Sequence, residues 1–317
     1  MAKTISVCIP CYNEQDNIAP LYEAIQKEFK EELPEYNYEI QFIDNHSTDR
    51  TREEILILCK NHKNVKAIFN AKNFPNESGY YGIIQTGGDC TVSIPADFQL
   101  PISKIHEFVK EWEKGYKIVC AIKESSKESG LMWRIRQFYY RQLKRFSNTD
   151  VIQNFSGCGL YDRSFLDLCR QIDDPIVSFG QIIATLGTDV TKVYYDEEKR
   201  KSGKSKESFF TLFDKAIMRF ISYSDLVPRF AIFAGIIMGI ISVAIAVTYF
   251  ILKMVYWNMF PAGMIPAVLG IFFIGSLQLF FLGMIGEYII KINKRLMKRP
   301  LVVEERRINF EHTENEK

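Results

Sequence analysis

Two long runs without a charged residue constrain this chain more than any other feature of its sequence. The first run covers 23 residues from Phe230 to Leu252, and the second covers 32 residues from Val255 to Gly286. A helix needs roughly 20 consecutive apolar residues to cross the hydrocarbon core of a bilayer. We therefore expect a membrane hairpin with helices near 230–252 and 263–286.

The part of the chain before these runs is long enough for one domain with its own core. Of all 317 residues, 47% are hydrophobic and 25% are charged, which excludes a disordered chain, a coiled coil, a collagen-like repeat and a small disulfide scaffold. The formal net charge of +2 argues against a general polyanion-binding protein, and we expect no nucleic acid partner. The composition thus indicates a globular head on the hairpin.

Positive charges flank the two runs unevenly. Only Lys253 lies between them, whereas the flanking residues are Lys215, Arg219 and Arg229 before the first run and Lys291, Lys294, Arg295, Lys298 and Arg299 after the second. The positive-inside rule then predicts a multi-pass protein of a bacterial-type inner (plasma) membrane, with the head and both termini in the cytoplasm. We expect no signal peptide, and we expect the seven cysteines to be free thiols in this reducing compartment.

The head alternates short β-branched runs with segments of helical periodicity. The predicted strands are Ile5–Pro10, Tyr38–Asp44, Val65–Asn70, Thr91–Pro95 and Lys117–Ile122. The predicted helices are Ile18–Leu33, Asp49–His62, Ser78–Gly87 and Ile102–Lys114. This order predicts a mostly parallel sheet with helices on both faces, a doubly wound α/β domain. In such sheets, ligands bind beyond the carboxyl ends of the strands.

Two further segments combine basic and apolar residues. Residues 131–146 have the pattern of a basic amphipathic helix, for which a surface helix packed on the core and a membrane-surface helix are equally good interpretations. Residues 199–206 carry five positive charges around Gly203, and the apolar residues of 207–228 recur at helical spacing. We expect 207–228 to be an amphipathic helix in the plane of the membrane interface.

Polar side chains cluster where three predicted strands end, at 10–14, 44–47 and 95–99. A single carboxylate at such a place is more often a helix cap or a solvated turn residue. Three clusters on one sheet edge instead favour a site, in which Asp97 could hold Mg²⁺ or Mn²⁺ against a diphosphate. Asp44 could accept hydrogen bonds from a base or a ribose.

Four motifs in order resemble those of glycosyltransferase family 2. They are Ser6–Glu14 (SVCIPCYNE), Ile43–Thr51 (IDNHSTDRT), Ala96–Pro101 (ADFQLP) and Arg200–Lys206 (RKSGKSK). Together with the two uncharged runs, the Gly286-Glu287-Tyr288 exit and the Lys298-Arg299-Pro300 tail, they most resemble the polyprenyl-phosphate branch, with its dolichyl-phosphate mannose synthases and bactoprenol glucosyltransferases. The resemblance covers nearly the whole chain. It implies a GT-A fold, a nucleotide-sugar donor, inverting transfer and a lipid phosphate acceptor.

The resemblance also assigns roles to individual residues. Those implied to bind the nucleotide sugar are Pro10, Tyr12, Glu14, Asp44, Asn45 and Gln99. Asp97 and Gln99 are implied to hold the metal and the diphosphate. Lys123 and Arg136 correspond to basic positions near the acceptor phosphate. The loop that closes over the phosphates would use Arg200, Ser205 and Lys206. The implied catalytic residues are Asp97, Arg200, Arg136 and Lys123.

The sequence departs from the family pattern at three positions. Pro95 replaces the first carboxylate of the usual Asp-x-Asp motif, so either Asp97, Gln99 and the donor diphosphate hold the metal with more water, or metal dependence is weaker. Asn45 replaces the second aspartate of Asp-Asp-Gly-Ser. Asn154 stands where many relatives have a carboxylate. A hydroxyl acceptor would need a general base, whereas a lipid phosphate is already ionised at neutral pH.

We therefore expect a cytosolic GT-A catalytic domain at 1–206, an interfacial helix at 207–228, a transmembrane hairpin at 229–288 and a cytosolic basic tail at 289–317. The expected reaction moves a sugar from a nucleotide sugar, with uracil as the favoured base, to a polyprenyl phosphate such as undecaprenyl phosphate for cell-envelope glycan modification. Another lipid or glycan acceptor, or an inactive nucleotide-sugar-binding membrane module, remain alternatives. The Gly235-x-x-x-Gly239 spacing would fit packing within the hairpin or in a homo-oligomer.

Overall fold

The computed structural model describes residues 2–124, 152–172, 179–198, 264–296 and 300–310, together with scattered positions between 237 and 256. The chain forms two compact units. One unit, which we call the head, comprises residues 1–145, 149–209 and 298–317, and the other comprises 146–148 and 210–297. The domain boundaries expected from the sequence stay predictions.

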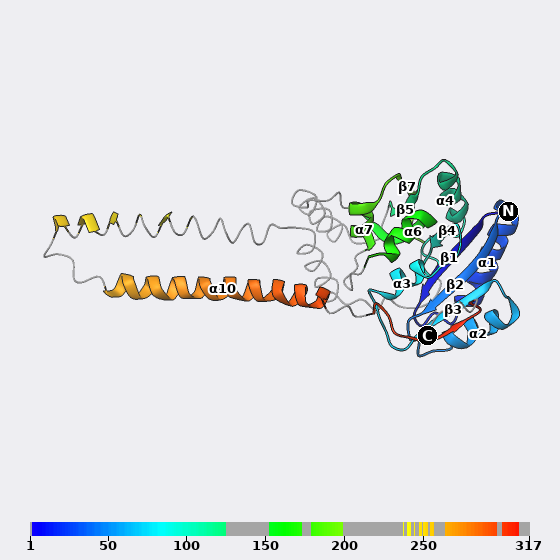
Figure 1. Ribbon diagram of the computed structural model, residues 1–317, viewed down its shortest axis with the longest axis horizontal. Coiled ribbons are helices and arrows are strands. Elements are labelled where there is room, and N and C mark those ends of the chain that lie inside the picture. The colour runs from blue at the N-terminus through cyan, green and yellow to red at the C-terminus, as the bar shows by residue number, and fades with distance from the viewer. Residues whose placement is uncertain are drawn as a thin grey trace. The chain divides into compact units, whose positions relative to one another are not determined.

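The head is built on one eight-stranded mixed sheet (Figure 1). Its strands are β1 (Thr4–Cys11), β2 (Asn37–Asp44), β3 (Val65–Asn70), β4 (Cys90–Ser93), β5 (Ile118–Lys123), β6 (Phe155–Asp162), β7 (Val190–Tyr195) and β8 (Glu304–Ile308). Their order in the sheet is β7-β5-β6-β4-β1-β2-β3-β8. The first five strands lie where the sequence predicts them, whereas β6, β7 and β8 were not predicted.

The strand directions decide which ends of the strands meet. β1 is parallel to β2 and β4, β2 is parallel to β3, and β5 is parallel to β7. β6 runs antiparallel to both β4 and β5, so β4 and β5 point the same way. The carboxyl ends of β1 to β5 and of β7 therefore lie at one edge of the sheet. This arrangement places the three predicted polar clusters along that edge.

Helices cover both faces of this sheet, as the alternating pattern predicts. They are α1 (Ile18–Glu32), α2 (Thr51–Asn61), α3 (Ser78–Ile84), α4 (Lys104–Glu113), α6 (Arg163–Arg170) and α7 (Phe179–Leu186). Buried side chains of α1, α2 and α4 pack with Val7 and Ile9 of β1, whereas those of α3, α6 and α7 form a second cluster with Cys8. Successive side chains of a strand point to opposite faces, so these are the two faces of one sheet. The α/β part of the predicted fold class is confirmed.

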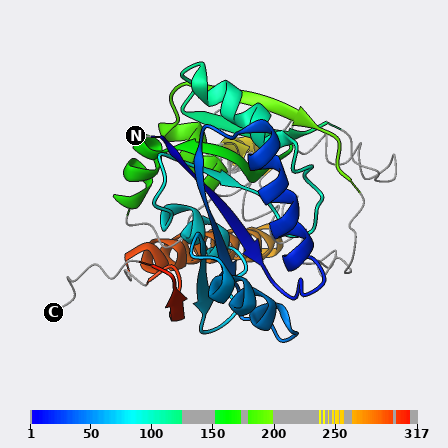
Figure 2. The ribbon, with the colours of Figure 1, turned by 90° about the vertical axis from the view of Figure 1, so that its right-hand side faces the viewer.

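The C-terminal strand β8 closes one edge of the sheet. In Figure 2 it is the red strand, at the far end of the sheet from the green strand β7. It pairs antiparallel with β3, and Val302 just before it is buried. The side-chain amide of Asn309 donates hydrogen bonds to the carbonyl oxygens of Cys59 and Val65, both at 2.7 Å. Part of the expected basic tail is therefore an integral strand of the head.

In the second unit, the described residues include one long helix, α10 (Met264–Leu296). Many of its apolar side chains are exposed, including Ile271, Leu279 and Leu282. Within the part of the chain that the structure describes, no helix combines the length and the apolar character required to cross a membrane. Most of the predicted first span and all of the predicted interfacial helix 207–228 lie outside the described residues.

All seven cysteines are free, as predicted. Cys8 and Cys11, which have the C-x-x-C spacing of redox sites, are both buried beside β2 and α3. Burial raises the pKa of both thiols well above its usual range. A thiol that stays protonated is a poor nucleophile and metal ligand, so these two cysteines act as packing residues.

Candidate functional site

Two groups of loops follow the strands at the carboxyl edge. The first group, which we call the β1–β3 loops, comprises the last residues of β1, β2 and β3 and the residues after them. Its ranges are 11–17, 44–52 and 70–78. We call residues 94–99, 123–124 and 195–198, which lie at the ends of β4, β5 and β7, the β4–β7 loops. β1 lies between β2 and β4 in the sheet, so the two groups are neighbours along the edge.

Side-chain hydrogen bonds tie the loop after β1 to the loop after β2. The hydroxyl of Ser47 accepts a hydrogen bond from the backbone nitrogen of Asn13 (2.9 Å), and the side-chain carbonyl of Asn13 accepts one from the backbone nitrogen of Thr48 (2.7 Å). Asn13 and His46 have positive φ angles of 58° and 64°. Asparagine and histidine tolerate this region better than most residues, which lets both loops turn sharply. The two loops therefore form one wall.

Glu14 is fixed in the same wall. Its backbone nitrogen donates to the hydroxyl of Thr51 (2.8 Å), and its carboxylate accepts from the side-chain amide of Asn17 (2.6 Å). Pro10 and Tyr12, also implied to bind the nucleotide, are half-buried at the same strand end. These contacts give Glu14 a local structural role, and the nucleotide contacts of all three residues stay predictions.

Asp44 is fully buried and ion-paired. Its carboxylate accepts hydrogen bonds from the backbone nitrogen of Ser47 (3.2 Å) and from Nε of Arg52 (2.6 Å), and its side chain has 0% exposure. The Arg52 guanidinium also donates to Glu305 of β8 (2.9 Å) and to the backbone oxygen of Asn70 (2.8 Å). Desolvation lowers the pKa of Arg52, but the hydrogen bonds to Asp44 and Glu305 outweigh it and raise this pKa overall. Any ligand contact of Asp44 must therefore involve this ion pair.

Asn45 attaches the loop after β3 to the wall. Its side-chain carbonyl accepts hydrogen bonds from the Asn70 amide (3.0 Å) and from the backbone nitrogen of Phe74 (2.7 Å). Its own amide donates to the side-chain carbonyl of Asn73 (2.7 Å). An aspartate could accept the first two bonds but could not donate the third. The replacement of the family's aspartate by Asn45 is thus matched by its surroundings.

Asp97 and Gln99 lie together after β4. Asp97 is only 7% exposed, and its carboxylate accepts a hydrogen bond from the backbone nitrogen of Gln99 (3.1 Å). Phe98 between them has a positive φ of 59°. The backbone oxygen of Gln99 accepts a hydrogen bond from the backbone nitrogen of Glu198 (3.1 Å), which attaches this loop to the end of β7.

Glu197 connects two residues that the resemblance implicates separately. One of its carboxylate oxygens accepts a hydrogen bond from the Gln99 side-chain amide (2.9 Å), and the other forms an ion pair with the Lys123 ammonium. The register of β5 and β7, with Lys123 opposite Tyr195, brings Glu197 to this place. Glu197 is not among the residues predicted from the sequence, because β7 is not among the predicted strands. A strand assignment for 190–195 would have put Glu197 among the strand-end residues.

The two carboxylates act on a common neighbour, Tyr195. Burial raises the pKa of the Tyr195 phenol to about 12. The charges of Cys158, Glu197 and Asp97 also raise this pKa, whereas a hydrogen bond from Ser156 lowers it. Burial also raises the pKa of Cys158 to about 11, against a hydrogen bond with Ser156 that lowers it, and the charge of Asp97 adds a smaller upward shift. Asp97 and Glu197 are thus both close enough to Tyr195 for their negative charges to raise its pKa.

The oxygen donors of the β4–β7 loops suit a hard cation. Asp97 and Glu197 supply carboxylates and Gln99 supplies an amide carbonyl, which are the ligand types that Mg²⁺ and Mn²⁺ take. No cluster of three or more His, Cys, Asp or Glu side chains that could hold a metal occurs among the described residues. The three oxygen donors named above thus fit the implied cation in ligand type, and a diphosphate or water would have to supply its remaining ligands.

Asn154 lies beside Lys123, at the start of β6. Its backbone oxygen accepts a hydrogen bond from the backbone nitrogen of Lys123 (3.3 Å), and its φ is 55°. Its side-chain oxygen is buried and has no hydrogen-bond partner within the described ranges. An amide at this position cannot act as a general base.

The structure thus brings Gln99 and Lys123 into contact with Glu197, and Asp97 is hydrogen-bonded to the backbone of Gln99. It places Tyr12, Glu14, Asp44 and Asn45 in the adjacent β1–β3 loops, with Pro10 just before them in β1. The other residues implied by the resemblance, Arg136, Arg200, Ser205 and Lys206, lie outside the described residues. Arg52 and Glu305 join the site through tertiary contacts that no sequence motif indicated.

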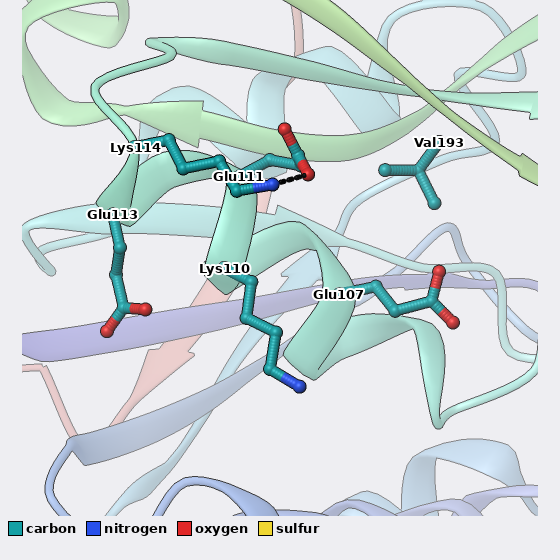
Figure 3. A pocket seen from close by; sticks show the side chains of 6 residues that line it. All are labelled: Glu107, Lys110, Glu111, Glu113, Lys114 and Val193. Atoms are coloured by element: carbon teal, nitrogen blue, oxygen red, sulfur yellow. Dashed lines mark hydrogen bonds and ion pairs between the residues drawn. The ribbon is translucent and has the colours of Figure 1, made fainter.

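A surface hollow of about 400 Å³ lies elsewhere, between α4 and β7 (Figure 3). It is lined by Glu107, Lys110, Glu111, Glu113, Lys114 and Val193. Lys114 is ion-paired with Glu111 at 2.6 Å. The lining mixes both signs of charge and contains none of the implicated residues, so we assign it no ligand.

The family model described as "Glycosyl transferase family 2" matches residues 6–169, slightly more than half of the chain. This match includes the β1–β3 loops, Asp97, Gln99, Lys123 and Asn154. It ends before Glu197 and β8.

Relatives match over nearly the whole chain. The uncharacterized glycosyltransferase sll0501 of Synechocystis sp. (strain ATCC 27184 / PCC 6803 / Kazusa) is 29% identical over 95% of this chain and 94% of its own length. The bactoprenol glucosyl transferase of Shigella phage SfX is 27% identical over 93% of this chain and 97% of its own length. Among solved structures, glucosyl-3-phosphoglycerate synthase from Mycobacterium tuberculosis in complex with phosphoglyceric acid has a TM-score of 0.49 at 16% identity, covering 70% of this chain and 80% of that one.

Proposed function

The chain belongs to glycosyl transferase family 2 and is a glycosyltransferase, and we propose that it moves a sugar from a nucleotide sugar, with UDP as the favoured carrier, to a polyprenyl phosphate such as undecaprenyl phosphate. The observation that carries the proposal is the placement of both groups of loops on one sheet edge. One group offers a rigid, neutral-to-acidic wall, and the other offers a lysine with oxygen donors for a cation.

The β1–β3 loops suit the nucleoside half of the donor. Their backbone is fixed by the hydrogen bonds of Asn13, Ser47 and Asn45, so a base and ribose would meet a preformed surface. A preformed surface binds without the entropic cost of ordering loops. We propose Pro10, Tyr12 and Asn45 as contacts of the nucleoside, and Asp44 as a contact through its ion pair with Arg52.

The β4–β7 loops suit the phosphates. In the proposed reaction, an oxygen of the lipid phosphate attacks the anomeric carbon of the sugar, and the bond from that carbon to the diphosphate oxygen breaks, so that the nucleoside diphosphate leaves with the electron pair. Asp97 and Gln99 would hold Mg²⁺ or Mn²⁺, which neutralises the charge of the diphosphate when bound. Lys123 would donate hydrogen bonds to a phosphate oxygen from the end of β5.

The groups at positions 154 and 197 support a phosphate acceptor over a hydroxyl acceptor. Position 154 carries an amide, and the Glu197 carboxylate is already held by Lys123 and Gln99. A hydroxyl must lose a proton to attack, whereas a phosphate monoester is largely ionised at neutral pH because its second pKa is about 6. The name of the phage SfX relative, a bactoprenol glucosyl transferase, supports the same acceptor class.

We propose that the second unit anchors the protein in a bacterial-type inner membrane, with the head in the cytoplasm. The support comes from the two uncharged runs of 23 and 32 residues, from the positive charges outside them, and from the exposed apolar side chains of α10. An anchored head would meet its lipid acceptor at the headgroup level. This turns the search for the acceptor into an encounter on a surface.

The test is direct transfer of label. We would incubate the detergent-solubilised full-length protein with undecaprenyl phosphate and a panel of labelled nucleotide sugars, with and without a chelator, and follow label into the organic phase. We expect label from one donor, and its loss on chelation. The proposal would be overturned if no donor labelled the lipid while the protein still bound a nucleotide sugar, because another acceptor or an inactive binding module would then explain the fold.

A further inference from the structure

Glu197 has an unusual position for a carboxylate, because it lies in a site proposed to bind phosphates. Its two oxygens contact the ammonium of Lys123 and the side-chain amide of Gln99, which are 74 and 98 residues away in the chain. The resemblance to the family implies a ligand-binding role for both partners.

The Lys123–Glu197 pair is not needed to join β5 and β7. The two strands pair over six registered residues, from Ile118 opposite Val190 to Lys123 opposite Tyr195, and Glu197 lies beyond the last of them. The side chains of Lys123 and Glu197 remain 21% and 24% exposed, so a ligand can reach the pair. Such a partly exposed pair contributes little to stability, on the order of 0–1 kcal/mol.

The charges around the pair set up a competition. Within the described part of the β4–β7 loops, Lys123 is the one positive side chain, whereas Asp97, Glu124, Asp196, Glu197 and Glu198 are negative. An arriving phosphate therefore meets one cation that already has an anionic partner. A phosphate carries up to two negative charges and three acceptor oxygens, and so is a stronger partner for an ammonium than a carboxylate is.

We infer that Glu197 is a positioning residue that competes with the substrate phosphate for Lys123, holding the lysine across the site in the free protein and releasing it when a phosphate binds. This inference deepens the proposed function and rests on it. The phosphate could be the diphosphate of the donor or the monophosphate of the lipid acceptor, because both present the same oxygens to Lys123.

The test measures binding in the full-length detergent-solubilised protein with chelator present, so that no divalent cation contributes. Two probes separate the sources of phosphate: UDP for the donor, and farnesyl phosphate, a short isoprenyl phosphate, for the acceptor. The variant Glu197→Gln keeps the size of the side chain and removes its charge. The matched control is Glu198→Gln, which removes the same charge from the next residue, whose side chain is exposed.

We expect Glu197→Gln to bind one of the two probes about threefold to tenfold more tightly than the parent, because the lysine loses its competing anion. Glu198→Gln should change the affinity by less than about twofold, since exposed charges are screened. The gain should disappear in a Lys123→Ala background, where Lys123→Ala and Lys123→Ala/Glu197→Gln should bind that probe equally. The probe that responds identifies the phosphate that Lys123 meets.

Unchanged or weaker binding of both probes by Glu197→Gln would overturn the inference, as would a gain that persists without Lys123. These results leave the proposed function standing if the parent binds UDP and transfers sugar. If the parent binds neither probe and transfers nothing, the proposed function fails and the inference fails with it.

Discussion

The β1–β3 loops and the β4–β7 loops share one edge of the same sheet, yet they are held in different ways. In the β1–β3 loops, neutral side chains such as Asn13, Asn45 and Ser47 bond to the backbone of another loop. In the β4–β7 loops, the side-chain contacts of Gln99 and Lys123 between loops converge on one charged side chain, Glu197. Bonds to the backbone fix a shape, whereas a pair of charged side chains can exchange partners. The β1–β3 loops therefore form a preformed wall, whereas the geometry of the β4–β7 loops depends on the charge of the ligand.

The largest effect on stability should come from breaking the ion pair behind the wall. Arg52→Ala would leave Asp44 buried without its partner, which we expect to lower the free energy of unfolding by about 3–5 kcal/mol. Thermal unfolding of the purified protein measures the change. Arg50→Ala is the control, because Arg50 lies two residues earlier, is 68% exposed and pairs with Glu53 at the surface. If both variants unfolded at the same temperature, the wall would not depend on the buried pair.

A smaller effect should follow from restoring the family's aspartate at position 45. Asn45→Asp would keep the hydrogen bonds from Asn70 and Phe74 but lose the one donated to Asn73, so we expect a loss of about 1–2 kcal/mol in stability. Weaker UDP binding should accompany it as the loop after β3 loosens. Asn76→Asp adds the same charge to the same loop at an exposed position and serves as the control. Equal losses in the two variants would show that charge, and not the lost donor, is responsible.

The smallest effect should come from the part of the wall that β8 supplies. Glu305 is 53% exposed, so Glu305→Ala should cost no more than about 1 kcal/mol, and Arg52 would keep Asp44 and Asn70 as partners. Glu304→Ala should cost more, because Glu304 is 19% exposed and accepts hydrogen bonds from Tyr81 and Arg307. Thermal unfolding of the two variants side by side checks this order. The reverse order would mean that Glu305 contributes more than Glu304 to the stability of the protein.

The sequence predicts the first half of the fold well because its signals are local. β1 to β5 are short runs rich in β-branched residues, and the intervening helices have regular apolar spacing, so each element can be recognised without knowing its partner. Boundaries differ by a few residues; for example, the helix expected at Asp49–His62 is observed at Thr51–Asn61. The rule that ligands bind at the carboxyl edge then led to Asp97 and Gln99, whereas Lys123 was implied by the resemblance to the family.

Two of the missed strands, β6 and β8, lack such local signals. β6 contains Gly157 and Gly159 with φ angles of 91° and 144°, and a Cβ atom on Gly159 would lie 2.0 Å from the carbonyl oxygen of Val119. Only glycine fits there, yet glycine reads as a loop residue in a sequence. β8 has the sequence EERRI, without an apolar alternation, and its partner β3 is more than 200 residues away. Charged edge strands are common, but only tertiary pairing identifies them.

The same limit applies to the site. Glu197 and Glu305 belong to it through contacts between distant segments, so no spacing in the sequence indicates them. Arg52 lies only eight residues after Asp44, but its role becomes visible only in its ion pairs with Asp44 and Glu305. Asn45 looked like a lost carboxylate in the sequence. In the structure, its amide donates a hydrogen bond that an aspartate could not make.

The most direct test of the account measures transfer and binding together in Asp97→Asn. Asp97 is 7% exposed in the β4–β7 loops, and the substitution removes its charge while keeping its size. If the wall binds the nucleoside and the β4–β7 loops act on the phosphates, the rate of transfer to undecaprenyl phosphate should fall by at least about 100-fold. The affinity for UDP, measured with chelator present, should stay within about tenfold of that of the parent. Transfer near the parental rate, or loss of UDP binding in a folded variant, would contradict this division of the site.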